Sequence, residues 1–206
     1  MELILVSAGR LKRDCSWEGT NFSSEDYEHT QPPPQIHTAD FNFKNRISIE
    51  GQPLTSPSER YTDDSKLDGV TGCAFCIFEG SNQKFQWMAK LQSFNSVFQT
   101  EIFAVNKAIE WANTTKIQAS ILGDSQSGLK APSSFKSKTK LIQETQMALL
   151  SNPSLNIGWV KSHVGVHGNE TADNLAKQAT IKGEIHYLSE RKSHRKNVLH
   201  RVSINK

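Results

Sequence analysis

The sequence predicts an α/β fold in which a five-stranded mixed sheet is flanked by helices. Between residues 58 and 182 the expected order of elements is strand, strand, strand, helix, strand, helix, strand, helix. Three consecutive strands can form a meander, and the alternation of helices with strands after them favours a mixed sheet with helices packed on it.

The first three strands are predicted from apolar runs and one turn. The first is short, because only residues 60–62 lead into Asp63. The second is the apolar run over 70–78, and the third covers 84–91 with its aromatic residues on one face. Residues 79–82 (EGSN) supply the turn of a hairpin between them.

A long helix is predicted to follow the hairpin. Ser96 and Gln99 match the capping-box pattern at its start. Glu101 then falls on the same stripe as Val97, Ala104 and other apolar residues, where a leucine would be expected. The remaining predicted elements are a strand over 117–123, a helix within 138–150, a strand over 155–159 and a last helix from about residue 169.

Composition divides the chain into three parts. Residues 1–57 are predicted to be a poorly ordered extension, because much of that stretch is polar and contains the run Gln31-Pro32-Pro33-Pro34. Residues 58–182 are the predicted folded domain, and 183–206 a basic tail. Residues 181–206 hold 7 Lys or Arg against 2 Asp or Glu, a net charge of 7 − 2 = +5. Such a tail suits a polyanionic partner, although a solvated charge run is an equally simple explanation.

The three cysteines, Cys15, Cys73 and Cys76, provide no disulfide framework. We therefore expect a reducing compartment, either the cytoplasm or the nucleus. The apolar run at residues 3–6 is far too short to cross a bilayer, so no membrane association is expected. We expect the protein to be a monomer.

Four acidic residues occupy positions that would place them near the core. Asp63 and Asp124 end predicted strands, Glu101 lies on an apolar helix face, and Asp173 lies in the last helix. Gathering carboxylates in a half-buried place is costly unless a cation neutralises them. The pattern favours a two-metal site that hydrolyses phosphodiesters, and the alternative is surface charge with accidental spacing.

Four segments carry a resemblance to a known family. They resemble the type 1 ribonuclease H domain, and they look most like the version found in non-LTR retrotransposons, where it follows a reverse transcriptase. The resemblance covers roughly 120 residues, and its segments are YTDDSK (61–66), SVFQTEIFAV (96–105), ILGDSQS (121–127) and WVKSHVGVHGNETADNLAKQA (159–179).

The resemblance implies a ribonuclease H-like fold and a metal-dependent endonuclease that hydrolyses the RNA strand of RNA–DNA hybrids. It implies that Asp63, Glu101, Asp124 and Asp173 bind two Mg²⁺ ions, with Mn²⁺ as a possible substitute, and that they act in catalysis together with His163. It also assigns Asn169 to nucleic-acid binding. Exposed lysines would contact phosphates, since residues 61–180 contain no arginine; the candidates are Lys130, Lys136, Lys138, Lys140 and Lys161.

The chain departs from the family pattern at two places. Asp64 stands where the family usually has glycine, and it is a lesser candidate for the metal site. The stretch before Asp63 is polar and contains Pro57, unlike an ordinary central strand. The second departure keeps open an alternative, a catalytically inactive relic of the fold that at most binds nucleic acid.

Two other kinds of site compete for some of these residues. Cys73 and Cys76 with His163 and His167 have the spacing of zinc ligands, but positions 73 and 76 of a strand point to opposite faces. Ser125 could suggest a hydrolase nucleophile, but it lacks the G-x-S-x-G turn that exposes such a serine. Buried inert thiols are therefore the simpler interpretation of the cysteines, and Ser125 is not expected to be a nucleophile.

Overall fold

The computed structural model describes residues 14–17, 19–23, 25–34, 36–50, 58–115, 118–191, 193–194 and 197–198. The chain forms two compact units, one of residues 31–187 and one of residues 1–30 with 188–206. Of the predicted extension, residues 1–13, 18, 24, 35 and 51–57 lie outside the described residues; so do residues 192, 195–196 and 199–206 of the predicted tail.

The smaller unit contains a two-stranded antiparallel sheet. Its strands are β1 (Cys15–Trp17) and β2 (Thr20–Phe22). A parallel bridge joins Tyr27 to Glu190, and both residues are buried, with exposed fractions of 2% and 4%. Part of the predicted extension therefore pairs with part of the predicted tail.

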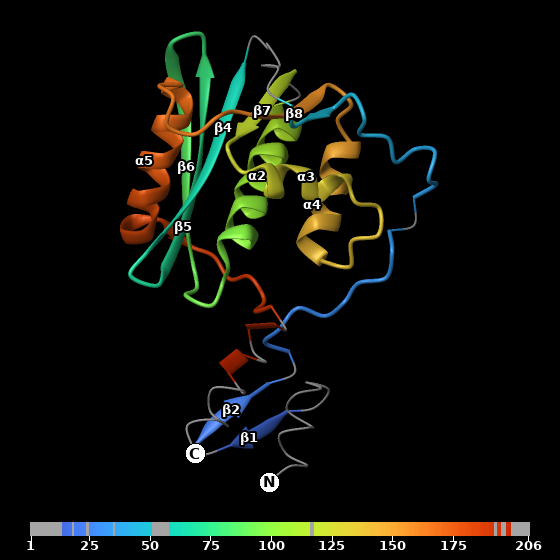
Figure 1. The fold of residues 1–206 in the computed structure, drawn as a ribbon, viewed down its shortest axis with the longest axis vertical. Helices are drawn as coiled ribbons and strands as arrows, with labels where there is room; N and C mark the ends of the chain where they lie inside the picture. The colour runs from blue at the N-terminus through green and yellow to red at the C-terminus, as the bar shows by residue number, and fades with distance from the viewer. Residues whose placement is uncertain are drawn as a thin grey trace. The chain divides into compact units, whose positions relative to one another are not determined.

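The larger unit is built on one mixed sheet, which has seven strands within the described residues (Figure 1). The five predicted strands form its centre, in the order β8-β7-β4-β5-β6, and a two-residue strand adds to each edge. The strands are β3 (Ile47–Ser48), β4 (Glu59–Leu67), β5 (Val70–Glu79), β6 (Asn82–Leu91), β7 (Ala119–Gly123), β8 (Leu155–Trp159) and β9 (Glu184–Ile185).

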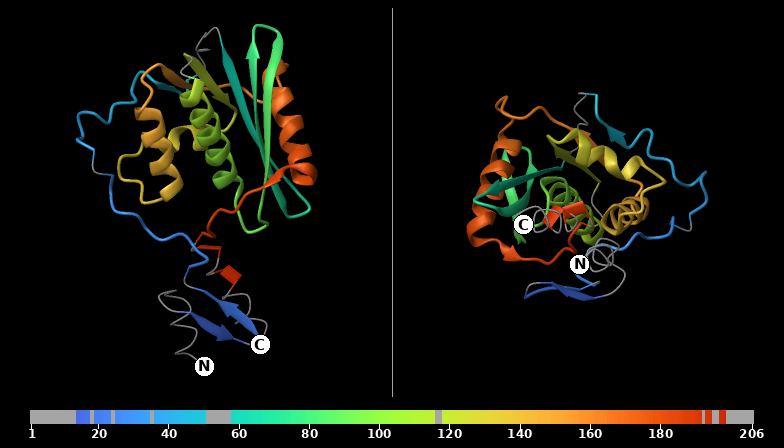
Figure 2. Two further views of the ribbon diagram at one scale, coloured as in Figure 1. Left: turned by 180° about the vertical axis from the view of Figure 1, so that it is seen from behind. Right: turned by 60° about the horizontal axis from the view of Figure 1, so that its bottom comes forward.

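Helices cover both faces of this sheet. The antiparallel hairpin β4-β5-β6 meets the parallel strands β7 and β8 at the centre. Figure 2 shows α5 on one face and α2 with α3 and α4 on the other. Their bounds are α2 (Val97–Thr115), α3 (Gln126–Lys130), α4 (Lys140–Leu150) and α5 (His167–Lys182), with a 3-10 turn, η1 (Ala131–Ser133), after α3.

The first predicted strand is a full central strand in spite of its polar sequence. β4 pairs with β5 along its whole length and with β7 along its first four residues. Arg60 is fully buried, and its guanidinium carbon lies 5.1 Å from the centre of the Trp111 ring. The Thr62 hydroxyl donates to the Leu122 carbonyl at 3.3 Å. The contact with Trp111 and the Thr62 hydrogen bond stabilise polar residues of the strand, while Arg60 Nε and Nη2 have no hydrogen-bond partner among the described residues.

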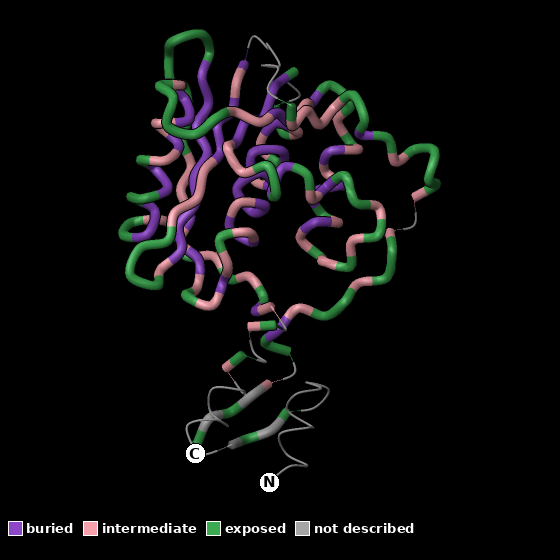
Figure 3. The backbone as a smooth tube through the Cα atoms, viewed as in Figure 1, coloured by how far each residue is buried: buried purple, intermediate pink, exposed green. Residues whose placement is uncertain are grey.

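Alternation along β5 separates two hydrophobic clusters. Phe75 and Ile77 pack with α2 and the strands β7 and β8, whereas Ala74, Cys76 and Phe78 pack with α5. The continuous apolar run is explained by this burial on both faces, which Figure 3 shows along the strand.

The predicted capping box opens α2. The Gln99 N–H donates to the Ser96 hydroxyl, and the Ser96 N–H donates to the Gln99 side chain, both at 3.2 Å. The helix is therefore fixed at its first turn, one turn before Glu101.

Glycine allows α5 to lie directly against the sheet. A Cβ at Gly72 of β5 would lie 2.6 Å from the Ala176 carbonyl oxygen, and a Cβ at Gly168 would overlap the Tyr61 ring. Both helix and strand backbones approach too closely for a side chain at these two positions. The first turn of α5 is consequently held over β4.

Residues 36–50 belong to the larger unit, whereas the sequence predicted them to be part of the poorly ordered extension. Phe43 is 5% exposed and joins the core cluster on the α2 side. Ile47 pairs with Ile157 in the strand contact of β3 with β8. The Arg46 guanidinium donates to the carbonyls of Leu149 and Asn152, both at 2.6 Å. A few apolar and charged anchors order this segment, and its mainly polar composition concealed them.

Candidate active site

Strand register brings Asp63 and Asp124 together. Thr62 of β4 is paired with Gly123 of β7 in the parallel ladder, and the two aspartates follow these residues. β7 ends at Gly123, whereas β4 continues past Asp63 to Leu67, so Asp63 does not end its strand as the sequence predicted. The two aspartates lie where the parallel pairing of β4 with β7 ends, and the carboxyl end of a parallel strand is a common position for ligand sites. The predicted proximity of these two acids is confirmed.

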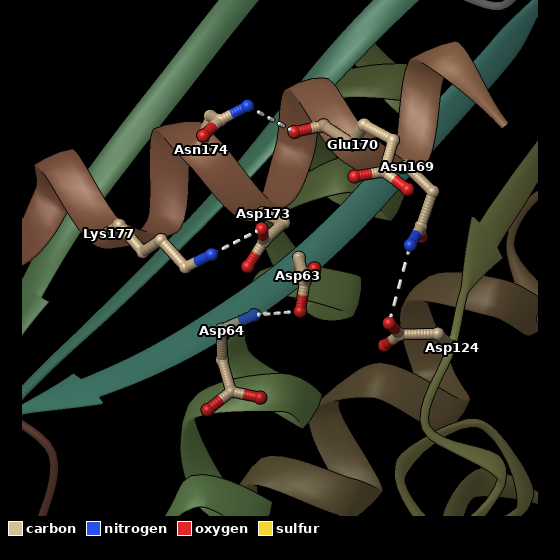
Figure 4. A network of polar contacts seen from close by, with 8 residues as sticks. All are labelled: Asp63, Asp64, Asp124, Asn169, Glu170, Asp173, Asn174 and Lys177. Carbon is tan, nitrogen blue, oxygen red and sulfur yellow. Dashed lines mark hydrogen bonds and ion pairs between the residues drawn. The ribbon is translucent and has the colours of Figure 1, made fainter. Parts of the chain in front are cut away.

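The other two predicted acids reach the same place from opposite sides of the sheet. Glu101 comes from the second turn of α2 and lines a pocket together with Asp63 and Asp124. Asp173 comes from α5, and its charge acts on Asp63. All four predicted carboxylates therefore surround one centre, and Figure 4 shows three of them with their polar neighbours.

Burial and mutual repulsion raise the pKa of Asp63. The pKa rises to about 8, first because the carboxyl is desolvated and then because Asp124, Asp173 and Glu101 lie nearby. Burial likewise raises the pKa of Asp64 to about 8, with Glu101 as the strongest neighbouring charge. Burial also raises the pKa of Glu101. The centre holds more negative charge than its own surroundings neutralise.

Asn169 is part of this acidic centre. Its side-chain amide donates from Nδ2 to Asp124 Oδ2 at 3.3 Å, as the dashed line in Figure 4 marks. Asn169 is only 2% exposed, and its Oδ1 has no hydrogen-bond partner. Its assignment to nucleic-acid binding stays a prediction, and in the structure its side chain lies against Asp124 and orients that carboxylate.

Further hydrogen bonds fix Asp124 and Glu101. The Trp159 indole donates to the Asp124 carbonyl at 2.7 Å, and the Ser125 hydroxyl is bonded to the Glu101 carboxylate. Ser125 is also the N-cap of α3, since its hydroxyl accepts from the Gly128 N–H at 3.3 Å. Ser125, which was not expected to be a nucleophile, is thus a cap and a carboxylate partner.

The helix α3 was not predicted, although it shapes the pocket. A Cβ at Gly128 would lie 3.0 Å from Glu101 Oε2 and 3.2 Å from Glu101 Cβ. Glycine at this position lets α3 approach α2 closely. The available signal was the spacing of Ser125 and Gly128 after Asp124, a pattern of a helix start that is too short to show periodicity.

Among the described residues, one of the four predicted acids forms an ion pair: Asp173 pairs with Lys177 of the same helix. The Lys177 Nζ lies 2.6 Å from Asp173 Oδ2, one helical turn along α5. The ion pair raises the pKa of Lys177, chiefly through this hydrogen bond. The i, i+4 spacing on a predicted helix could have revealed this partner from sequence.

His163 lies at the rim of the centre. It occupies the exposed loop between β8 and α5, with a φ angle of 54° that is uncommon for residues other than glycine. Ligand atoms of His163, Glu170 and Asp173 lie within 4.8 Å of one another. His163 therefore lies close to Asp173, its catalytic role stays a prediction, and Lys161 is exposed in the same loop.

The cysteines of the described core do not form a zinc site. Cys73 and Cys76 are fully buried free thiols on opposite faces of β5. Burial raises the pKa of Cys73 well above its ordinary value and that of Cys76 to about 12. The Cys76 Sγ instead lies 3.5 Å from the Gly168 carbonyl oxygen. The expectation of inert buried thiols agrees with this arrangement.

The arrangement of strands and acids agrees with the comparison to known families. The sequence model of the RNase H family matches residues 56–181. The chain belongs to the RNase H family. The match spans β4 to α5, and thus all four predicted carboxylates lie inside it.

A solved structure shares the fold. The chain is similar to the prototype foamy virus protease–reverse transcriptase, with 20% sequence identity and a TM-score of 0.53. The similar region covers 63% of this chain and 22% of that one. The ribonuclease H-like fold predicted from sequence is confirmed. No helix in the described residues is long and apolar enough to span a membrane.

Proposed function

We propose that this RNase H domain is a divalent-metal-dependent endonuclease that hydrolyses the RNA strand of RNA–DNA hybrids, and that it derives from a retrotransposon. The observation that carries the proposal is the convergence of Asp63, Glu101, Asp124 and Asp173 from four separate elements. The polar sequence before Asp63 favours an inactive relic, but β4 pairs with β5 along its whole length and with β7 over its first four residues, which supports an intact domain. The proposal extends to a monomer in the cytoplasm or nucleus.

The residues of the centre fit a divalent cation. The donor set consists of carboxylate oxygens, which Mg²⁺ and Mn²⁺ prefer. Asn169 adds a buried amide oxygen without a partner, and Asp64 adds a buried carboxylate oxygen without one. A cation site without its cation is expected to have buried oxygens that lack partners and carboxyl groups with raised pKa values.

In this proposal Asp63, Glu101, Asp124 and Asp173 hold two divalent cations. The bound cations would activate the attacking water and stabilise the leaving oxygen of the phosphodiester. Asn169 keeps the Asp124 carboxylate oriented through its 3.3 Å hydrogen bond. His163 lies at the solvent side of Asp173, where its imidazole nitrogen can carry a proton to or from the reacting oxygens.

Exposed lysines of the domain suit a polyanionic substrate. Lys130 ends α3, and Lys161 lies in the loop that also carries His163. Lys136, Lys138 and Lys140 are exposed in and after the loop that joins η1 to α4. Phosphate contacts of this kind are independent of sequence and weaken with salt, and discrimination of RNA from DNA would come from the 2′-hydroxyl and the groove shape.

The proposed function predicts selective cleavage of hybrids. With Mg²⁺, the full chain is expected to cut the labelled RNA strand of an RNA–DNA hybrid and to leave duplex RNA and duplex DNA intact. The measurement is gel analysis of the three substrates of one sequence and length, with and without a chelator. Equal cutting of duplex DNA, or cutting that persists in the chelator, would contradict the proposal.

A second prediction concerns His163. We expect His163→Ala to slow turnover by about a hundredfold, the usual contribution of a proton-transfer group, because the carboxylates that hold the cations remain in place. Single- and multiple-turnover rates separate the chemical step from product release. Substitution of His37, an exposed histidine in a loop, by alanine is the matched control. An unchanged rate in His163→Ala would remove the assigned role.

A further inference from the structure

Asp64 points away from Asp63 and toward α2. Neighbouring residues of a strand face opposite sides, and Asp64 shares a hydrogen bond with Glu101 on the α2 side. Its backbone N–H also donates to Asp63 Oδ1 at 2.7 Å, so the residue contacts two acids of the centre (Figure 4). Asp64 thus joins the Glu101 side of the site to the Asp63 side.

Contact between the carboxyl groups of Asp64 and Glu101 requires a positive charge or a proton between them. Among the described residues, no lysine or arginine forms an ion pair with either group. Lys66, the next residue on the same face of β4, donates instead to the carbonyls of Ser93 and Asn95 at 3.1 and 3.3 Å. The lysines and arginines of the described residues therefore leave this pair without an ion-pair partner.

One carboxylate oxygen of Asp64 has no hydrogen-bond partner among the described residues. This oxygen is Oδ2, a buried atom. On the far side of the centre, Asn169 is 2% exposed and its Oδ1 is equally unpaired. Two buried oxygens without partners at one acidic centre are costly, and a divalent cation offers the charge and the coordination that both lack.

We propose that Asp64 is a fifth carboxylate of the metal centre, binding a divalent cation together with Glu101. The inference rests on the proposed function, since it adds a ligand to the same centre. It also gives a physical role to an aspartate at a position where a glycine would supply no ligand. The additional fixed negative charge strengthens the binding of a cation and is felt most where water is excluded.

Cation binding without substrate tests this role directly. Isothermal titration of the full chain with Mg²⁺ or Mn²⁺ alone is expected to give an affinity about tenfold weaker for Asp64→Asn than for the wild type. Asp68→Asn is the matched control, because it makes the same change of charge at an exposed position in the turn directly after β4. Its affinity should equal that of the wild type, and thermal melts establish that each variant folds.

The outcomes separate this role from the function itself. Wild-type affinity in a folded Asp64→Asn variant overturns the assignment of Asp64 as a ligand, while hybrid cleavage by the wild type would leave the proposed function standing. Absence of cation binding by the wild type overturns both. A weaker affinity in Asp64→Asn with an unchanged affinity in Asp68→Asn supports the fifth carboxylate.

Discussion

Replacement of Asp124 by asparagine is expected to abolish cleavage of the hybrid while the fold and hybrid binding persist. Asp124 is the carboxylate held by Asn169 and by its own backbone contact with Trp159. An asparagine oxygen can still accept the bond from Asn169, so the local structure should survive. The lost negative charge removes a cation ligand, and a metal centre contributes several kcal/mol to the chemical step. The expected loss of rate is therefore about a thousandfold or more.

The measurement pairs cleavage with binding. Cleavage of the labelled hybrid is followed with Mg²⁺, and hybrid affinity is measured separately by fluorescence anisotropy at fixed salt. Glu110→Gln is a control on α2, where the acid is exposed and pairs with Lys107 at 2.7 Å; it should cleave at the wild-type rate. Retained cleavage in Asp124→Asn would refute the assigned centre, whereas lost hybrid affinity would show that the variant damages the substrate surface.

The core of the fold and the four acids could be predicted because their signals are local. The capping box fixes the start of α2, and the apolar stripe of that helix reveals Glu101 as a charged residue in a core position. Asp124 follows β7, and Asp63 lies in β4 directly after its pairing with β7 ends; apolar or family-like runs mark both places in the sequence. Each of these inferences depends on residues within a few positions of one another.

Other features depend on contacts between distant segments, which no local pattern records. Asn169 is an ordinary polar residue in the sequence, and only the packing of α5 on β4 places it against Asp124, 45 residues away. The edge strands β3 and β9 have two residues each, too few for any alternation. From sequence, Arg60 is an unfavourable residue for a central strand, and only the structure shows that its guanidinium lies over the Trp111 ring.

The start of the larger unit could not be predicted from local sequence patterns either. Residues 36–50 look like a linker by composition, because polar residues and a nearby proline run dominate the stretch. Phe43 and Arg46 are sufficient to hold it, through core burial and through hydrogen bonds to the end of α4. A few well-placed anchors can order a polar segment, and composition averages over them.

Without metal, the protein is expected to lose stability as the pH rises from about 4 to about 8. The pKa of Asp63 is about 8 in the folded state against 3.8 for the unperturbed carboxyl. Between these values the folded state keeps a proton that the unfolded state gives up, so increasing pH favours unfolding. The destabilisation is absent below about pH 4 and complete above about pH 8. Burial and repulsion by Asp124 cause it.

Asp63→Asn should weaken this dependence and stabilise the metal-free protein at pH 8, while Asp64, whose pKa is also raised to about 8, retains part of it. Each unit of pKa shift corresponds to about 1.4 kcal/mol. Because Asp64 and Asp124 contribute to the same repulsion, neutralising Asp63 alone should recover only about 2–3 kcal/mol. Chemical denaturation in chelator at pH 4 and pH 8 measures the gain, which should be present only at the higher pH.

Enough added Mg²⁺ should make the wild type more stable than Asp63→Asn. A cation that binds only the folded state stabilises it by mass action, and Asp63→Asn lacks one of its ligands. The wild type should therefore gain more stability from Mg²⁺ than the variant, although it is the less stable protein in chelator. A gain for Asp63→Asn that is equal at pH 4 and pH 8 would show that its cause is packing. The negative charge of Asp63 that destabilises the metal-free centre also helps to hold the cation, so neutralising Asp63 should raise stability in chelator and lower affinity for Mg²⁺.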